Sequence, residues 1–247
     1  MILEDILYSQ GIGMRRVCAG LIQRGLVQVQ TADGIWQTIT DTAADFDTDG
    51  PGELWFSVQG KAWLFQAKAY LMLHKPAGIE CSQKPSAWPS VYTLLPDALR
   101  NRPVKGGKPG VQAVGRLDQD TTGLLLLSDD GTFIHRMSSP RKQLAKVYQI
   151  QARHPVTPEQ IARLLQGVVL EDDPKPVQAS HCQLHDSHHL EMAITSGKYH
   201  QVKRMIAAVG NRVEQLHRSQ IGALHLPADL PPGQWRWLNA QERALLG

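Results

Sequence analysis

Hydrophobic positions in the first thirty residues follow two helical stripes and then a short alternating strand. Apolar side chains recur at helical spacing over residues 3–7 and again over 17–22, with a glycine-containing break between them. Gly25 ends the second stripe, and valine alternates with glutamine over residues 27–30. A spacing of three or four residues is typical of an amphipathic helix, and strict alternation is typical of a half-buried strand. The pattern therefore predicts helix, turn, helix and strand.

A change of pattern near residue 69 divides the chain into two domains. We expect residues 1–60 to form a small domain, residues 61–68 a linker, and residues 69–247 a larger domain. Apolar runs in the larger domain predict strands at 69–73, 124–127, 146–152 and 190–194, and amphipathic helices at 157–167 and 201–209. Many strands mixed with few helices favour the α+β class with a mostly antiparallel mixed sheet.

Composition is that of an ordinary globular protein. Of 247 residues, 42% are hydrophobic and 20% are charged, and no apolar run is long enough to cross a bilayer. The first residues carry acids instead of the basic segment of a signal peptide. Three cysteines lie far apart and outside CxxC pairs, which favours a reducing compartment over a disulfide framework or a structural zinc site. We therefore expect a cytoplasmic protein without a membrane segment.

The distribution of charge indicates more than the net charge of +3. Residues 41–53 hold five acids and no base, whereas residues 198–218 hold five bases and the single acid Glu214. A basic cluster set apart from an acidic one is typical of a protein that contacts phosphates with part of its surface. A solvated basic face is the alternative.

The most informative segment is a polar turn that leads directly into a buried strand. Residues 115–123 hold Asp118, Asp120, two hydroxyls and flanking glycines, and a leucine run follows at 124–127. Turns mounted on rigid strands often carry catalytic groups. Alternatively, both aspartates cap local backbone N–H groups in Asx-turns. A metal loop is a weaker alternative, because the acidic spacing does not continue to a bidentate glutamate.

A histidine-rich segment at residues 181–189 also raises the question of a metal. It holds His181, Cys182, His185, His188 and His189. No Cys or His spacing completes a tetrahedral ligand set, so we interpret these histidines as strand-flanking and turn residues and expect no metal site.

Five motifs, in order, carry a family resemblance. The segment GRLDQDTTGLLLL at residues 115–127 resembles the catalytic motif of the pseudouridine synthases, in the branch that modifies small- and large-subunit rRNA. Four further segments match in the right order: LHKPAG (73–78), KVY (146–148), SGKYHQVKRM (196–205) and LHR (216–218). The N-terminal thirty residues resemble the S4-type RNA-binding module of this branch. The segment YHQVKRM and the tail DLPPG resemble the enzymes that act on 16S rRNA.

The resemblance implies an enzyme that isomerises one uridine of rRNA to pseudouridine without a cofactor. Its expected partner is 16S rRNA or a 30S assembly intermediate, and its expected state is a monomer. Three alternatives stay open. They are a large-subunit rRNA enzyme, a non-catalytic RNA-binding module for ribosome assembly, and a metal-dependent hydrolase built on Asp118, Asp120 and Asp129.

By resemblance, Asp118 is the catalytic carboxylate, acting as nucleophile or as base. In the predicted helix 201–209, Lys203 lies about 100° from Val202, at the rim of the apolar stripe, and Arg204 lies about 200° away. Lys203 is therefore expected to pair with Asp118, while Arg204 points to solvent or RNA phosphate. A solvated rim lysine is the alternative.

Two further side chains are expected to support the active site. Tyr148 matches the family's active-site aromatic residue, and an aromatic ring can receive a base that has left its stack. Packing on its strand is the alternative for Tyr148. Arg116, two residues before Asp118, is expected to hold or extrude the flipped nucleotide, or else to pair with Asp120 or Asp129.

Further basic side chains are expected to contact RNA. They are Arg15, Arg16 and Arg24 in the N-terminal module, and Lys75, Lys146, Lys198, His200, Arg204 and Arg218 in the larger domain. The N-terminal module departs from the S4 pattern at Asp5, where a lysine is usual, and at Met14, where a serine is usual.

Overall fold

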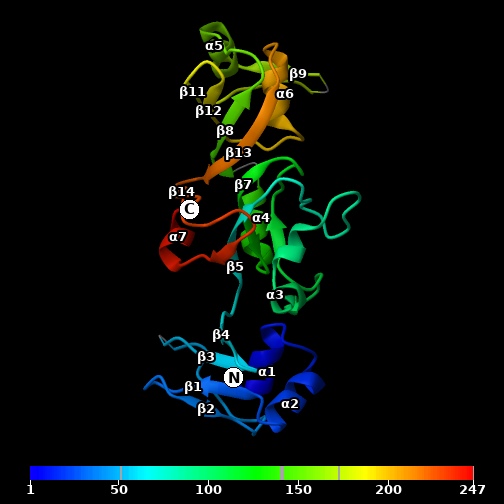
Figure 1. The fold of residues 1–247 in the computed structure, drawn as a ribbon, viewed down its shortest axis with the longest axis vertical. Coiled ribbons are helices and arrows are strands. Elements are labelled where there is room, and N and C mark those ends of the chain that lie inside the picture. The colour runs from blue at the N-terminus through cyan, green and yellow to red at the C-terminus, as the bar shows by residue number, and fades with distance from the viewer. Residues whose placement is uncertain (51, 140–141, 172, 247) are drawn as a thin grey trace. The chain divides into compact units, whose positions relative to one another are not determined.

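The computed structural model describes residues 1–50, 52–139, 142–171 and 173–246, and its chain divides into two compact units (Figure 1). Unit 1 contains Met1–Ala69, Leu95–Gln112 and Ser128–Asp130. Unit 2 contains Tyr70–Leu94, Ala113–Leu127 and Gly131–Gly247. Unit 2 thus begins within one residue of the predicted start of the larger domain, but two later segments that the sequence assigns to that domain belong to unit 1.

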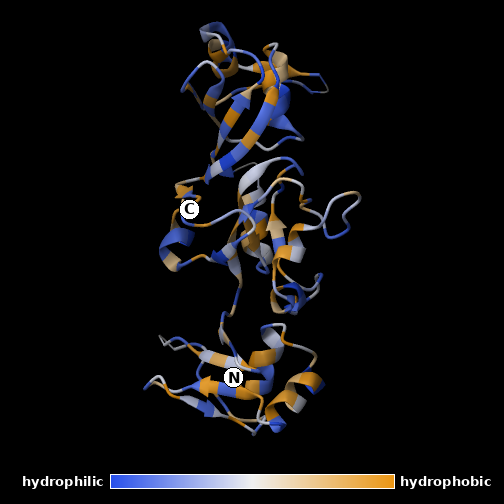
Figure 2. Ribbon diagram, viewed as in Figure 1, coloured by the Kyte–Doolittle hydropathy of each residue, from blue (hydrophilic) through white to orange (hydrophobic). Residues whose placement is uncertain are grey.

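Unit 1 contains the predicted helix, turn, helix and strand. Helices α1 (Leu3–Ser9) and α2 (Arg15–Gln23) share a hydrophobic core with a sheet of order β2-β1-β3-β4. The remaining elements are β1 (Val27–Gln30), β2 (Trp36–Thr38), β3 (Trp55–Val58), β4 (Lys61–Leu64) and α3 (Asp97–Asn101). Figure 2 shows hydrophobic residues along these helices and strands.

Two details of unit 1 differ from the prediction. Val17 is 50% exposed, and its neighbour Cys18 is the residue that enters the core. The predicted linker, residues 61–68, begins as strand β4, because residues 61–64 pair with β3 in an antiparallel ladder.

In the part of the chain that the structure describes, unit 2 is built on a nine-stranded sheet. Its order is β11-β12-β8-β13-β7-β5-β15, with β14 beside β13 and β6 beside β7. The strands are β5 (Tyr70–Lys75), β6 (Gln112–Val114), β7 (Thr122–Ser128), β8 (Lys146–Ala152), β11 (His181–Leu184), β12 (His189–Ile194), β13 (Val213–Ile221), β14 (Leu224–His225) and β15 (Trp235–Trp237). Strand β13 pairs parallel with β7 and antiparallel with β8, and β12 pairs antiparallel with β8 and β11. The predicted α+β class is confirmed.

Short helices and a separate hairpin complete unit 2. They are a 3-10 turn (Val91–Leu94), α4 (Gly131–Ser138), α5 (Pro158–Gln166), α6 (Gln201–Ala208), α7 (Ala240–Ala244), and the paired strands β9 (Val168–Leu170) and β10 (Asp173–Val177). Helix α5, expected at residues 157–167, begins with a capping box, in which the side chains of Thr157 and Gln160 each accept from the other's backbone N–H. None of the described helices is long and apolar enough to span a membrane.

A buried ion pair explains why two later segments belong to unit 1. Arg102 Nε donates to Asp129 Oδ2 at 2.6 Å, and its two other nitrogens donate to Gln10 Oε1 at 2.8 Å and Gln66 O at 2.7 Å. The other oxygen of Asp129 accepts from the Ala69 N–H at 2.7 Å. Both partners of the pair are almost fully buried. The third carboxylate that the hydrolase alternative requires is therefore already used inside unit 1.

Breaking this pair should destabilise unit 1. In Asp129→Asn the buried Arg102 guanidinium faces a neutral group, so we expect the free energy of unfolding to fall by about 3 kcal/mol or more. Urea denaturation followed by circular dichroism measures this change. Asp97→Asn, which removes an exposed ion pair with Arg100, is the matched control and should cost less than about 1 kcal/mol. Equal stability of the two variants would contradict a structural role for the pair.

Candidate active site

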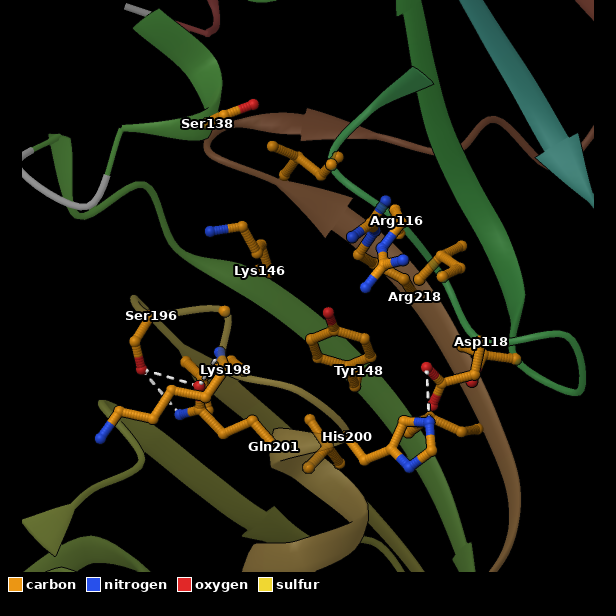
Figure 3. A pocket seen from close by; sticks show the side chains of 18 of the residues that line it. Arg116, Asp118, Ser138, Lys146, Tyr148, Ser196, Lys198, His200, Gln201 and Arg218 are labelled. Carbon is orange, nitrogen blue, oxygen red and sulfur yellow. Dashed lines mark hydrogen bonds and ion pairs between the residues drawn. The ribbon is translucent and has the colours of Figure 1, made fainter. Parts of the chain in front are cut away.

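The turn before β7 forms one wall of a cavity of about 420 Å³ in unit 2 (Figure 3). Other walls come from β8, β13, the end of α4 and the start of α6. The cavity brings together side chains that are far apart in the sequence: Arg116, Asp118, Thr121, Lys146, Tyr148, Lys198, His200, Lys203 and Arg218. The four residues predicted to form the active site, Asp118 and its three supports, thus line one cavity.

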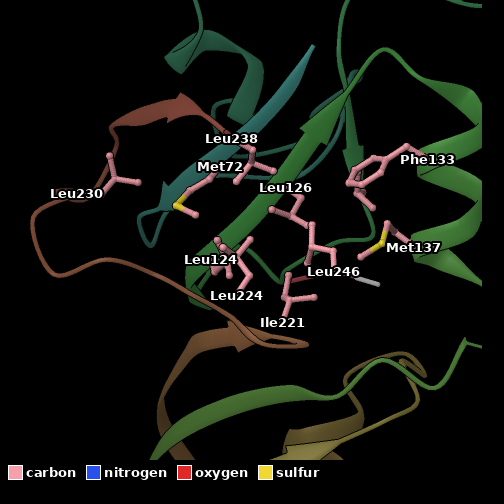
Figure 4. Close-up of a cluster of buried hydrophobic side chains, with 11 residues drawn as sticks. Met72, Leu124, Leu126, Phe133, Met137, Ile221, Leu224, Leu230, Leu238 and Leu246 are labelled. Atoms are coloured by element: carbon pink, nitrogen blue, oxygen red, sulfur yellow. The ribbon is translucent and has the colours of Figure 1, made fainter. Parts of the chain in front are cut away.

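Strand β7 is a rigid support for this turn because its side chains are anchored in the core of unit 2. Leu124 and Leu126 are fully buried in a cluster that also contains Met72, Phe133 and Ile221 (Figure 4). Burial of each leucine contributes roughly 2 kcal/mol. A strand held in this way fixes the end of the turn that precedes it.

Gly123 allows β7 to approach β13 closely. Its φ is 108°, and a Cβ at this position would lie 2.2 Å from the carbonyl oxygen of Arg218. In the parallel ladder, Arg218 is the register partner of Gly123, and His217 is the partner of Thr122. Only glycine fits here. The close approach places Arg218 beside the turn.

Lys75 holds the turn in place. Its Nζ donates to the carbonyl oxygens of Pro76 at 2.9 Å, Gln119 at 3.1 Å and Thr121 at 2.8 Å. The side chain is fully buried, and this burial lowers the pKa of Lys75. The prediction that Lys75 contacts RNA is therefore wrong. An ammonium has three donors, and here all three are used by the protein.

Lys203 connects the two carboxylates of the turn. Its Nζ lies 3.0 Å from Asp118 Oδ2 and 2.6 Å from Asp120 Oδ1. The predicted pairing of Lys203 with Asp118 is present, and Arg204 instead donates to the carbonyl oxygen of Tyr199. The sequence does not predict that Lys203 is shared with Asp120.

The sharing changes the acid–base behaviour of both partners. Partial burial alone would lower the pKa of Lys203, but its hydrogen bonds to the two carboxylates raise it above the usual value. Partial burial alone would raise the pKa of Asp120, but Lys203 lowers it below the usual value. Lys203 therefore stays charged at physiological pH, and Asp118 always faces a cation.

His200 is a second basic group at Asp118. Its Nε2 lies 3.3 Å from Asp118 Oδ1, and its ring stacks on Tyr199 with centroids 3.8 Å apart. His200 precedes α6 with a φ of 48°, a left-handed conformation that few residues other than glycine adopt. The sequence predicts an RNA contact for His200, but the spacing of motifs gives no sign that it lies beside Asp118.

Tyr148 and Arg116 line the cavity, as a role at the active site requires. Tyr148 is buried on β8, where Arg218 on β13 is its register partner, and Figure 3 shows its ring between Arg218 and His200. Arg116 is exposed. The carboxylates named as its alternative partners are bound elsewhere, since Asp120 pairs with Lys203 and Asp129 with Arg102.

The other predicted RNA contacts in unit 2 include three cavity residues. Lys146 is half-buried, and its burial together with the nearby charge of Arg218 lowers its pKa. Lys198 also lines the cavity, but its ammonium pairs with Asp173. Arg218 is 3% exposed, so it can meet RNA only through a group that enters the cavity.

The three N-terminal arginines differ in how far they are engaged. Arg15 pairs with Asp5, the acid that departs from the S4 pattern, and lies over the ring of Tyr8. Arg24 Nε donates to the carbonyl oxygen of Gly20. All three side chains are exposed, and the pairing with Asp5 makes Arg15 the weakest candidate for a phosphate contact.

The histidine-rich segment forms ordinary side-chain pairs. His181 lies 3.7 Å from Glu191, and His189 lies 2.8 Å from Asp186. Among the residues that the structure describes, no group of three or more His, Cys, Asp or Glu side chains is placed to hold a metal ion.

Known proteins are similar to this chain in sequence and in fold. Residues 69–208 match the family described as RNA pseudouridylate synthase. Ribosomal small subunit pseudouridine synthase A of Vibrio vulnificus (strain CMCP6) is 37% identical over 187 residues, which cover 74% of this chain and 76% of the relative. The protein of that name from Escherichia coli (strain K12) is 38% identical over 175 residues, with coverage of 71% and 72%. A crystal structure of a pseudouridylate synthase covers 100% of both chains with a TM-score of 0.66 and 28% identity.

The chain therefore belongs to the RNA pseudouridylate synthase family. It is an enzyme, a pseudouridine synthase, and the cavity beside Asp118 is its candidate active site.

Removing one of the two carboxylates tests how Lys203 is shared. In Asp120→Asn the pKa of Lys203 should fall toward the ordinary lysine value, because one stabilising negative charge is lost. NMR of ¹³C-labelled lysine side chains during an alkaline titration measures this pKa. Asp186→Asn, which removes a carboxylate paired with His189, is the control and should leave the pKa of Lys203 unchanged. A pKa that is the same in wild type and Asp120→Asn would contradict the sharing.

Proposed function

We propose that this chain isomerises a uridine of small-subunit rRNA to pseudouridine, with Asp118 as the reacting carboxylate. The side chains around Asp118 support this proposal. Lys203 lies 3.0 Å from one carboxylate oxygen and His200 lies 3.3 Å from the other, while Tyr148 lines the same cavity. A cation fixed beside a reacting charge, as Lys203 is here, stabilises that charge without the reorganisation that water requires.

The chemistry requires a carboxylate and room for the base to turn. The bond between N1 and C1′ breaks, the uracil turns, and C5 bonds to C1′ while C5 loses a proton and N1 gains one. The product has the same atoms as the substrate, so the isomerisation consumes no co-reactant. Asp118 can serve as a nucleophile or as a base, and the ring of Tyr148 offers a face to a uracil that has left its stack.

Exposed and partly exposed basic groups of both units fit an RNA substrate. We propose that Arg116 and Arg204 contact the RNA strand near the cavity, and that residues 1–60 act as an S4-like module through Arg16 and Arg24. The relatives named for the small ribosomal subunit favour 16S rRNA, free or in a 30S assembly intermediate. Three free cysteines agree with the reducing cytoplasm, where we propose that the protein works as a monomer.

Replacing the reacting carboxylate should abolish turnover without loss of the fold. The reaction releases the hydrogen on C5, so 16S rRNA transcribed with [5-³H]uridine reports each event as tritium in water. We expect Asp118→Asn to lower the rate on the order of a thousandfold or more, with unchanged RNA affinity and unfolding free energy. The matched control is Asp186→Asn, whose side chain lies on the turn between β11 and β12.

Four outcomes of this assay would contradict the proposal. Full activity of Asp118→Asn would exclude Asp118 as the reacting group. Tritium release from 23S rRNA but not from 16S rRNA would favour the large-subunit alternative. No release from any rRNA or assembly intermediate would favour the non-catalytic alternative. Loss of activity with a chelator would instead support the hydrolase alternative, in which a metal ion takes part.

A further inference from the structure

Two buried side-chain atoms lack a hydrogen-bond partner among the described residues, and both belong to residues that line the cavity. They are Arg218 Nη2 and Thr121 Oγ1. Arg218 is 3% exposed and Thr121 is 1% exposed. A buried donor without a partner carries the full cost of desolvation, and such groups are rare in native proteins. Their occurrence at one cavity indicates that a ligand completes them.

Arg102 in unit 1 is a buried arginine with a structural role, and its hydrogen bonds can be compared with those of Arg218. Arg102 is as deeply buried as Arg218, and each of its three side-chain nitrogens donates to a protein oxygen. Arg218 donates through Nε to the carbonyl oxygen of Leu124 at 2.8 Å, which fixes its direction and leaves Nη2 unused. Figure 3 shows the side chain of Arg218 beside Tyr148 in the cavity.

The two threonines of the turn show the same contrast. Thr122 Oγ1 lies 2.9 Å from His217 Nδ1 and is therefore satisfied within the protein. Thr121 Oγ1, one residue earlier, has no partner and lies in the cavity wall. The chain thus provides a matched pair of hydroxyls that differ in this respect.

Depth in the cavity decides which part of a nucleotide reaches these atoms. A phosphate within an RNA strand continues into the chain on both sides, so it stays near the opening, where the exposed Arg116 lies. The base is the part of a flipped nucleotide that enters a pocket, and it is commonly recognised by hydrogen bonds to its Watson–Crick edge. The buried Arg218 and Thr121 are therefore placed for the base.

We propose that Arg218 and Thr121 bind the imide edge of the target uracil. Arg218 Nη2 donates to the carbonyl oxygen O4, and Thr121 Oγ1 accepts from N3–H. Cytosine presents an amino group in place of O4, so its donor would face the donor Arg218 Nη2. The Thr121 hydroxyl can accept from N3–H of uracil or donate to N3 of cytosine, so Arg218 carries the discrimination between the two bases and Thr121 adds affinity. This inference rests on the proposed function, because it assigns to the same cavity the groups that bind the target base.

Thr121→Val and Thr122→Val form a matched test. Binding of 5′-UMP and 5′-CMP at millimolar concentration is measured by NMR titration, and stability is measured by urea denaturation. Thr121→Val should be at least as stable as wild type, because it removes an unsatisfied group, yet bind 5′-UMP about tenfold more weakly. Thr121→Ser should restore the affinity. Thr122→Val should be less stable but retain wild-type affinity for 5′-UMP.

Arg218→Gln tests the other contact. An amide side chain can donate to O4 of uracil or accept from the amino group of cytosine, so the preference for 5′-UMP over 5′-CMP should fall to about one. Should that variant not fold, the threonine pair still decides the matter. A destabilised Thr121→Val with wild-type 5′-UMP affinity would overturn the inference, because Thr121 would then be structural. Failure of the proposed function appears separately, as a wild-type protein that releases no tritium. A wild type that releases tritium but binds 5′-UMP and 5′-CMP equally contradicts only the inference.

Discussion

The geometry of the active site depends on one buried ammonium group. Lys75 lies at the end of β5 and donates to the carbonyl oxygens of Gln119 and Thr121 in the turn. The desolvation of a buried lysine is costly, and three carbonyl partners offset that cost only while the turn keeps its shape. Because Lys75 holds Gln119, the residue after Asp118, Asp118 keeps a fixed position before β7. A surface lysine at this position would leave the turn free to move.

Asp118 is contacted by two basic side chains, one at each carboxylate oxygen, and remains partly exposed in the cavity. The Lys203 ammonium divides between Asp118 and Asp120, and His200 approaches from the other oxygen. A lysine ammonium is a point charge without the planar fork of an arginine, so Lys203 can contact one oxygen of each carboxylate. Tyr148 then supplies an apolar surface in the same cavity. The site thus combines a carboxylate in a fixed position, the cation of Lys203 and an aromatic surface for a nucleobase.

Much of this arrangement follows from local patterns in the sequence, and the rest depends on long-range contacts. Helical spacing alone distinguishes Lys203 from Arg204, and the leucine run predicts β7. Motif order identifies the family. In contrast, burial of Lys75 depends on carbonyl groups more than forty positions away, and the pairing of Asp129 with Arg102 depends on how unit 1 closes around them. No periodicity or spacing rule contains such information, so these basic residues look alike in the sequence.

We propose that this chain places pseudouridine in small-subunit rRNA through Asp118. The most direct measurement maps pseudouridine at single-nucleotide resolution in rRNA from cells that lack the gene, complemented with wild type or with Asp118→Asn. We expect one site in 16S rRNA to lose its modification in cells without the gene, wild type to restore it, and Asp118→Asn to leave it unmodified. An unchanged 16S rRNA map, or full restoration by Asp118→Asn, would show that Asp118 of this chain does not make the modification.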